Sequence, residues 1–119
     1  MSWKLDKNRP VCPQITEQIC VKIASGEFVA GEKLPSVREV AVAAGVNPNT
    51  VQKSFEQLEQ SGVIYSVRGS GNFVSEDVSI AKQSATEIIT NKTANYIEEM
   101  QNLGVGKADI LKYIEELIK

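Results

Sequence analysis

The spacing of apolar residues predicts three short helices in the first half of the chain. Two sets of these residues recur every three or four positions, as on the buried face of an amphipathic helix. They are Ile15, Ile19 and Ile23 in the first set, and Val51, Phe55 and Leu58 in the second. A shorter apolar pattern, Val37, Val40 and Ala41, lies between these two sets. Together the three patterns predict helices at residues 14–25, 37–44 and 48–61.

Capping and turn signals join the last two of these helices closely. Ser36 and Glu39 have the spacing of a capping box, in which each side chain bonds the backbone of the other residue. Gly45 lies between the helices, and Asn47 and Pro48 suit the cap and first turn of the second one. A helix, a tight turn containing glycine and another helix make up the helix-turn-helix pattern, which we therefore predict here.

After the third helix the pattern becomes that of a β-hairpin. The β-branched and aromatic residues at 63–67 and 72–74 flank the turn sequence Arg68-Gly69-Ser70-Gly71. Taken alone, this segment is compatible with an ordinary surface hairpin that carries a solvated arginine. Because it directly follows a helix-turn-helix, we expect a wing that faces the same duplex.

The last part of the chain predicts two amphipathic helices. Residues 77–103 contain no glycine or proline, and we expect a kink or weak turn at Asn91-Lys92-Thr93, which interrupts the apolar stripe. Gly104-Val105-Gly106 separates this segment from a second helix at 107–119. Two helices of this size make a poor independent core, so they need a partner, most simply the same segment of a second chain. The alternative is a monomer in which they pack on the N-terminal head.

The third helix opens with a polar face that is suited to reading DNA. Recognition helices contact base edges with the residues of their N-terminal turns. Asn49 and Gln52 can pair bidentately with adenine, and Thr50 can meet a thymine methyl group or a phosphate. Lys53, and Arg38 in the preceding helix, can neutralise phosphates.

The overall charge excludes a protein that binds nucleic acid as a polycation. The chain has 13 Lys/Arg and 15 Asp/Glu, a formal net charge of −2 and a pI of about 5.2. Residues 1–75 carry eight basic and seven acidic residues, whereas residues 76–119 carry five and eight. This distribution favours a head that contacts DNA through a few placed groups.

The composition also argues against catalysis and metal binding. The chain has no histidine, which is the commonest general base and metal ligand, and Cys12 and Cys20 lack CxxC spacing. We therefore expect no enzymatic activity, no cofactor and no metal. The sequence has no apolar run near the ~18 residues of a membrane span and no signal-peptide core, so we expect a soluble, cytoplasmic protein.

Three ordered motifs make the chain resemble the GntR family of bacterial transcription regulators. They are Leu34-Pro35-Ser36-Val37-Arg38-Glu39-Val40-Ala41, Val46-Asn47-Pro48-Asn49-Thr50-Val51 and the segment from Gly62 to Val74. The resemblance covers residues 10–75 almost continuously. The short C-terminal part is similar to that of the YtrA-type subfamily, whose tail is a pair of helices that dimerises. Most other GntR regulators carry a much larger effector-binding domain.

The resemblance implies a winged helix-turn-helix DNA-binding domain at 1–75 and a helical dimerisation segment at 76–119. Such a protein binds a palindromic operator in double-stranded DNA as a homodimer and usually represses transcription. The DNA-contacting positions of the family match Arg38 in the second helix, Asn47, Asn49, Thr50, Gln52 and Lys53 at the recognition helix, and Arg68 and Gly69 at the wing tip, which enters the minor groove. Several family members have arginine where this chain has Pro48 and Gln52.

Two questions stay open at the level of sequence. One alternative function is a protein-interaction adaptor that kept the winged-helix shape without binding DNA, and the acidic pI is compatible with it. The other question is whether a small-molecule effector binds between the head and the helical tail. The sequence names neither the effector nor the operator.

Overall fold

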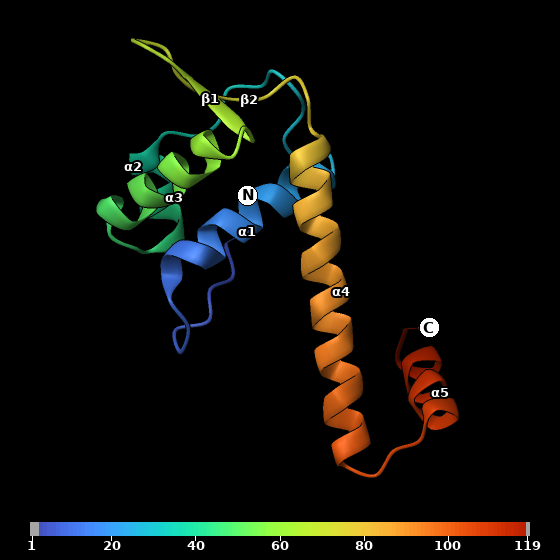
Figure 1. The fold of residues 1–119 in the computed structure, drawn as a ribbon. Helices are drawn as coiled ribbons and strands as arrows, with labels where there is room; N and C mark the ends of the chain where they lie inside the picture. Colours follow the sequence, from blue (N-terminus) through green and yellow to red (C-terminus); the bar gives the residue numbers. More distant parts are fainter. Residues whose placement is uncertain (1–2, 119) are drawn as a thin grey trace. The chain divides into compact units, whose positions relative to one another are not determined.

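The structure is a computed structural model that describes residues 3–118, and Figure 1 shows its ribbon. Over these residues it has five helices and one two-stranded antiparallel sheet, which confirms the mainly α fold with a small hairpin. In chain order the elements are α1 (Val11–Ala24), α2 (Val37–Ala44), α3 (Pro48–Gln60), β1 (Ile64–Val67), β2 (Gly71–Val74), α4 (Ser79–Asn102) and α5 (Lys107–Ile118). The chain forms two compact units: the head, up to Ala85, and the tail, from Thr86 onward.

The capping box of α2 forms as predicted. The Ser36 Oγ accepts a hydrogen bond from the Glu39 N–H, and the Ser36 N–H donates to the Glu39 carboxylate, both at 3.0 Å. The helix ends at Gly45, whose φ of 70° lies in the left-handed region that favours glycine. The Val46 N–H then donates to the Ala41 carbonyl, so the chain turns tightly into α3.

Helix α1 begins earlier than the sequence predicts. The apolar pattern predicts a helix from residue 14, but the helix starts at Val11 and includes Pro13 in its first turn. Proline is tolerated there because the first N–H groups of a helix have no partner within the helix. The predicted start was wrong by three residues because proline was treated as a boundary of the helix, whereas it can also occupy the third position of the first turn.

Gln14 fastens the segment that precedes α1. Its side chain is buried, accepts a hydrogen bond from the Asp6 N–H at 2.7 Å, and donates to the Asp6 carbonyl at 2.8 Å and the Pro10 carbonyl at 3.0 Å. Trp3 and Leu5 also pack against the core. The irregular N-terminal segment is therefore part of the folded head.

The head has one hydrophobic core between α1, α2, α3 and the hairpin. Its most completely buried apolar side chains are Ile15, Ile19, Val40, Val51, Leu58, Ile64 and Val74. Phe28 and Leu34, which anchor the connection between α1 and α2, are buried as well. Burying one such side chain contributes about 1.5–3 kcal/mol, so this cluster accounts for much of the favourable free energy of the head.

The hairpin has the predicted strands and a third segment beside them. β1 and β2 pair with Ile64 opposite Val74 and Tyr65 opposite Phe73. On the other edge of β2, residues 31–34 run antiparallel to it. The Gly31 N–H donates to the Val74 carbonyl, the Val74 N–H to the Glu32 carbonyl, and the Leu34 N–H to the Asn72 carbonyl, at 2.8–2.9 Å.

Helix α4 starts in the head and continues without a break. Ala81 and Ala85 in its first turns are buried, with 1% and 4% of their surface exposed. No turn interrupts the chain at Asn91-Lys92-Thr93, where a kink or weak turn was expected, because α4 remains helical through these residues. The Thr93 hydroxyl donates to the Ile89 carbonyl at 2.8 Å, a local bond that keeps this polar side chain compatible with the helix.

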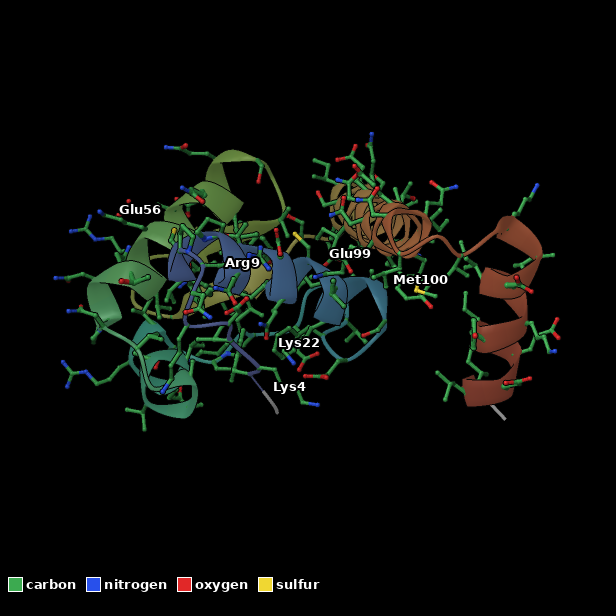
Figure 2. The ribbon with its side chains drawn as sticks, turned by 90° about the horizontal axis from the view of Figure 1, so that it is seen from below. Lys4, Arg9, Lys22, Glu56, Glu99 and Met100 are labelled. Carbon is green, nitrogen blue, oxygen red and sulfur yellow. The ribbon has the colours of Figure 1, made fainter. Side chains whose placement is uncertain are left out.

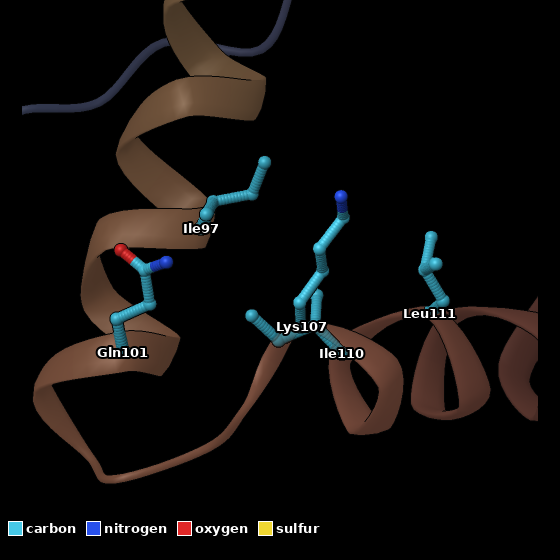
Figure 3. Close-up of a pocket in the computed structure, with 5 residues that line it drawn as sticks. All are labelled: Ile97, Gln101, Lys107, Ile110 and Leu111. Atoms are coloured by element: carbon cyan, nitrogen blue, oxygen red, sulfur yellow. The ribbon is translucent and has the colours of Figure 1, made fainter.

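The tail contains most of α4 and all of α5. An apolar groove of about 220 Å³ is lined by Ile97 and Gln101 of α4 and by Lys107, Ile110 and Leu111 of α5 (Figure 3). Ile110 is buried, but most of the other large apolar side chains in the tail are exposed. Of the helices that the structure describes, none is long and apolar enough to cross a membrane.

Candidate nucleic-acid interface

Helix α3 buries one face and presents the other to solvent. Val51, Phe55 and Leu58 are at most 3% exposed, as their spacing predicts. On the opposite side the predicted DNA-contacting residues Asn49, Gln52 and Lys53 are exposed, and Thr50 is half-buried. The polar first turns of α3 are thus accessible in the folded chain.

Ser54 holds α3 in place and was not singled out from the sequence. Its side chain is fully buried, and its hydroxyl donates to the Cys12 carbonyl of α1 at 2.9 Å. This bond fixes the position of α3 on α1 and satisfies a polar group that would otherwise be costly to bury. Ser54 lies three residues after Val51, so helical periodicity alone could have placed it on the buried face.

The side chain of Asn47 caps α3, which limits the hydrogen bonds that it can make to DNA. Its side-chain oxygen accepts a hydrogen bond from the Asn49 N–H at 2.8 Å and caps α3, as predicted. The amide NH₂ group is exposed and has no hydrogen-bond partner in the described structure. Asn47 can therefore donate a hydrogen bond to a phosphate or a base while it caps the helix, but its oxygen is already engaged.

Glu56 contacts one of the candidate base-reading residues. It lies on α3 (Figure 2), and its carboxylate accepts a hydrogen bond from the Gln52 side-chain amide at 3.3 Å. The bond uses one of the two amide protons of Gln52 and leaves the other proton and the carbonyl oxygen available. Gln52 therefore keeps the donor and acceptor pair that adenine requires.

The three basic side chains among the candidate residues, Arg38, Lys53 and Arg68, are exposed and have no acidic partner in the described residues. Arg38 projects from α2, Lys53 from α3 and Arg68 from the turn of the hairpin. None of the three forms an ion pair with a carboxylate in the described part of the chain. Their charges are therefore free to neutralise phosphates without first breaking an internal salt bridge.

The tip of the hairpin has the backbone of a tight turn. The Ser70 N–H donates to the Val67 carbonyl at 2.9 Å, and Gly69 has a φ of 81°. A side chain at Gly69 would meet no atom within 4 Å, so the tip is open to solvent. Below the tip the rings of Tyr65 and Phe73 stack with centroids 5.5 Å apart, which stiffens the hairpin.

Figure 1 shows the hairpin projecting beyond the packed pair α2 and α3. Helix, turn, helix and projecting hairpin form a winged helix-turn-helix, and the candidate residues lie on its second helix, third helix and wing tip. The family model described as bacterial regulatory proteins of the gntR family matches residues 13–74. The chain belongs to the GntR family.

Relatives of this GntR chain are similar over nearly its full length. The HTH-type transcriptional repressor YtrA of Bacillus subtilis is 35% identical over 115 residues, which cover 91% of this chain and 84% of that protein. A solved GntR family regulator from Listeria monocytogenes is 38% identical, with a TM-score of 0.80 and coverage of 94% and 98%. The short tail therefore belongs to the YtrA type of GntR regulator.

A structure solved with DNA supports the same assignment for the head. AraR(DBD) in complex with operator ORE1 is 30% identical and has a TM-score of 0.54, covering 63% of this chain and 94% of that one. This GntR chain is thus a DNA-binding transcription regulator. Its relatives are named as transcriptional regulators, which implies a non-enzymatic role.

Proposed function

We propose that this GntR regulator is a cytoplasmic, homodimeric repressor that binds a palindromic operator. The observation that carries the proposal is the accessible polar start of α3, accompanied by exposed cations at Arg38, Lys53 and Arg68 that lack acidic partners in the described residues. The printed name of the relative YtrA, a transcriptional repressor, supports the direction of regulation.

Each candidate residue has a role that its surroundings allow. Arg38 and Lys53 contact the phosphate backbone, while Asn49 and Gln52 read base edges in the major groove. Thr50 contacts a thymine methyl group or a phosphate. The remaining contacts come from the Asn47 amide as a donor and from Arg68 and Gly69 at the wing tip in the minor groove.

In this proposal the tail joins two subunits into a dimer. Leu103, Leu117 and Ile118 are 78%, 84% and 78% exposed, and apolar groups in such numbers favour burial against another surface. The simplest partner is the same helical segment of a second chain, so the dimer would form through the predicted dimerisation segment at 76–119, which contains the tail. Because each head has few cations, two heads on one two-fold axis would bind an inverted repeat far more tightly than one head.

Selection of bound duplexes from a random DNA pool, repeated at two salt concentrations, tests the proposal. We expect an inverted repeat to be enriched and the affinity to fall steeply as salt rises. Arg38→Ala should weaken binding to all sequences alike, whereas Gln52→Ala should cost roughly 1–3 kcal/mol of discrimination at one base pair. Lys112→Ala in α5 is the control for a lost positive charge outside the head.

Two results would contradict the proposal. The first is the absence of any enriched sequence, which would favour the adaptor without DNA binding. The second is unchanged affinity and base preference in both head variants, which would remove the residue assignments while leaving DNA binding itself intact.

A further inference from the structure

Lys33 lies in the segment that pairs with the outer edge of the wing. It forms an isolated antiparallel bridge with Phe73, and the neighbouring Leu34 N–H donates to the Asn72 carbonyl. Residues that pair across strands have side chains on the same face of the sheet. Lys33 therefore shares a face with Phe73 and with Tyr65, which pairs with Phe73 from the other side.

The side chain of Lys33 extends along this face toward the wing tip. A Cβ atom placed on Gly71 would lie 3.1 Å from the Lys33 Cε and 3.9 Å from its Nζ. Gly71 is two residues closer to the tip than Phe73 and pairs with Val67, the last residue of β1. The lysine stem thus crosses from the base of the wing to its outer end, where Gly71 leaves room for it.

We propose that Lys33 is a further contact to the DNA backbone, and that Gly71 admits its side chain to the outer end of the wing. This inference rests on the proposed DNA-binding function. It adds a fourth cation to Arg38, Lys53 and Arg68, one that comes from the connection between α1 and α2.

The surroundings of Lys33 suit a phosphate contact. Lys33 forms no ion pair in the described part of the chain. Glu39, whose pKa is lowered mainly by hydrogen bonds from Ser36 and also by the charge of Lys33, already accepts the Ser36 N–H. Lys33 lies three residues before the N-cap of α2 and pairs with β2. It is therefore close to two elements that face the duplex in the proposed complex.

The packing over Gly71 also reduces the freedom of the lysine side chain. A freely solvated lysine samples many rotamers and loses them when it binds a phosphate. Here the stem already lies along the wing, so less freedom remains to be lost.

The test compares Lys33→Met, which keeps the stem and removes the charge, with Lys33→Arg, which keeps the charge. Lys92→Met on α4 is the matched control. The probe is the duplex that the unmodified protein selects from a random DNA pool, and its affinity is measured over a range of salt concentrations. Melting temperatures and base preferences are recorded for each variant.

Removing one phosphate contact from each subunit should lower the salt dependence of binding in a defined way. For Lys33→Met we expect the slope of log affinity against log salt to decrease by about 0.9 per subunit. The affinity should fall roughly tenfold per subunit at about 0.1 M salt, equally for all sequences. Lys33→Arg and Lys92→Met should keep the slope of the unmodified protein.

The outcomes separate this inference from the proposed function. If Lys33→Met and Lys92→Met have the same salt slope while the unmodified protein binds DNA, the phosphate contact is refuted and the proposed function stands. If the unmodified protein binds no duplex at any salt concentration, both fail. A lower melting temperature with an unchanged slope assigns Lys33 a structural role only and also refutes the contact.

Gly71→Ala provides a second, independent measurement. The added Cβ meets the Lys33 stem, and the φ of 121° at this position adds strain. We expect a loss of affinity that is smaller when Lys33→Met is already present, because the displaced charge is then gone. Gly26→Ala, with a φ of 87° and open space around its Cβ, controls for strain alone. Fully additive losses from Gly71→Ala and Lys33→Met would contradict the proposed role of Gly71.

Discussion

Helices α3 and α5 have similar lengths and similar amphipathic patterns, yet their apolar faces differ in burial. In α3 the apolar face is covered by the rest of the head, and Leu58 is 0% exposed. In α5 only Ile110 is buried, while Leu117 and Ile118 are mostly exposed. The comparison teaches that periodicity predicts a helix with an apolar face. It does not predict which other part of the molecule, or which partner, buries that face.

The largest expected effect comes from removing the tail after Ala85. If the head folds independently and the tail joins two subunits, the shortened chain should unfold cooperatively and sediment as a monomer. Loss of the second head should reduce operator affinity by about 10²- to 10⁴-fold, because the avidity of the dimer is lost. Analytical ultracentrifugation and gel-shift titration measure the two quantities. A shortened chain that remains dimeric would place the dimer contact in the head.

A pair of leucine substitutions contrasts the two apolar faces directly. Leu58→Ala leaves a cavity in the core of the head and should lower the free energy of unfolding by about 2–5 kcal/mol. Leu117→Ala, at a position that is 84% exposed, should change the stability of a separated subunit very little. Urea denaturation at several protein concentrations distinguishes these effects. Equal losses in dilute protein would mean that the tail is covered within one chain.

The cap of α2 should contribute less than the core. Ser36→Ala removes the hydroxyl that accepts the Glu39 N–H, and we expect a loss of about 1 kcal/mol in the free energy of unfolding. Ser70→Ala, at the exposed wing tip, serves as the control for losing a serine hydroxyl elsewhere in the head. A loss for Ser36→Ala no greater than that of the control would show that the capping box adds nothing to stability.

The smallest expected effect is a dependence of stability on pH through the same cap. Hydrogen bonds from Ser36 hold the pKa of Glu39 below its ordinary value of 4.5. A carboxyl group with a lower pKa in the folded state stabilises the fold above its unfolded pKa, and this contribution is lost as the pH falls through the folded pKa. Glu39→Gln should therefore flatten the acid side of the stability curve in urea titrations. Parallel curves for both proteins would contradict the prediction.

The sequence predicted those parts of the fold that depend on local signals. The caps at Ser36 and Asn47, the turn at Gly45 and the hairpin around Gly69 each follow from residues within a few positions of one another. The candidate residues of α3 also follow from a local signal. The apolar spacing identifies the buried side of this helix, so the polar residues on the opposite side could be chosen as candidates for DNA contact.

Features that depend on distant contacts were missed. Gln14 reads as an ordinary polar residue, and only the folded structure shows its side chain holding the backbone at Asp6 and Pro10. Lys33 gave no periodic signal, since its position follows from pairing with β2, forty residues along the chain. The weak turn considered at Asn91-Lys92-Thr93 did not form, because modest helix propensity does not end a helix whose neighbouring turns are well formed.

The double pairing of β2 restricts where the hairpin can change in length. One edge of β2 is bonded to β1 and the other to residues 31–34, so an added residue within β2 would shift both ladders at once. Such a slip turns Val74 from the interior to solvent and moves Phe73 the other way. Insertions or grafted sequences can therefore be accommodated at the Arg68–Ser70 loop, which makes this loop the natural place to engineer a longer reach.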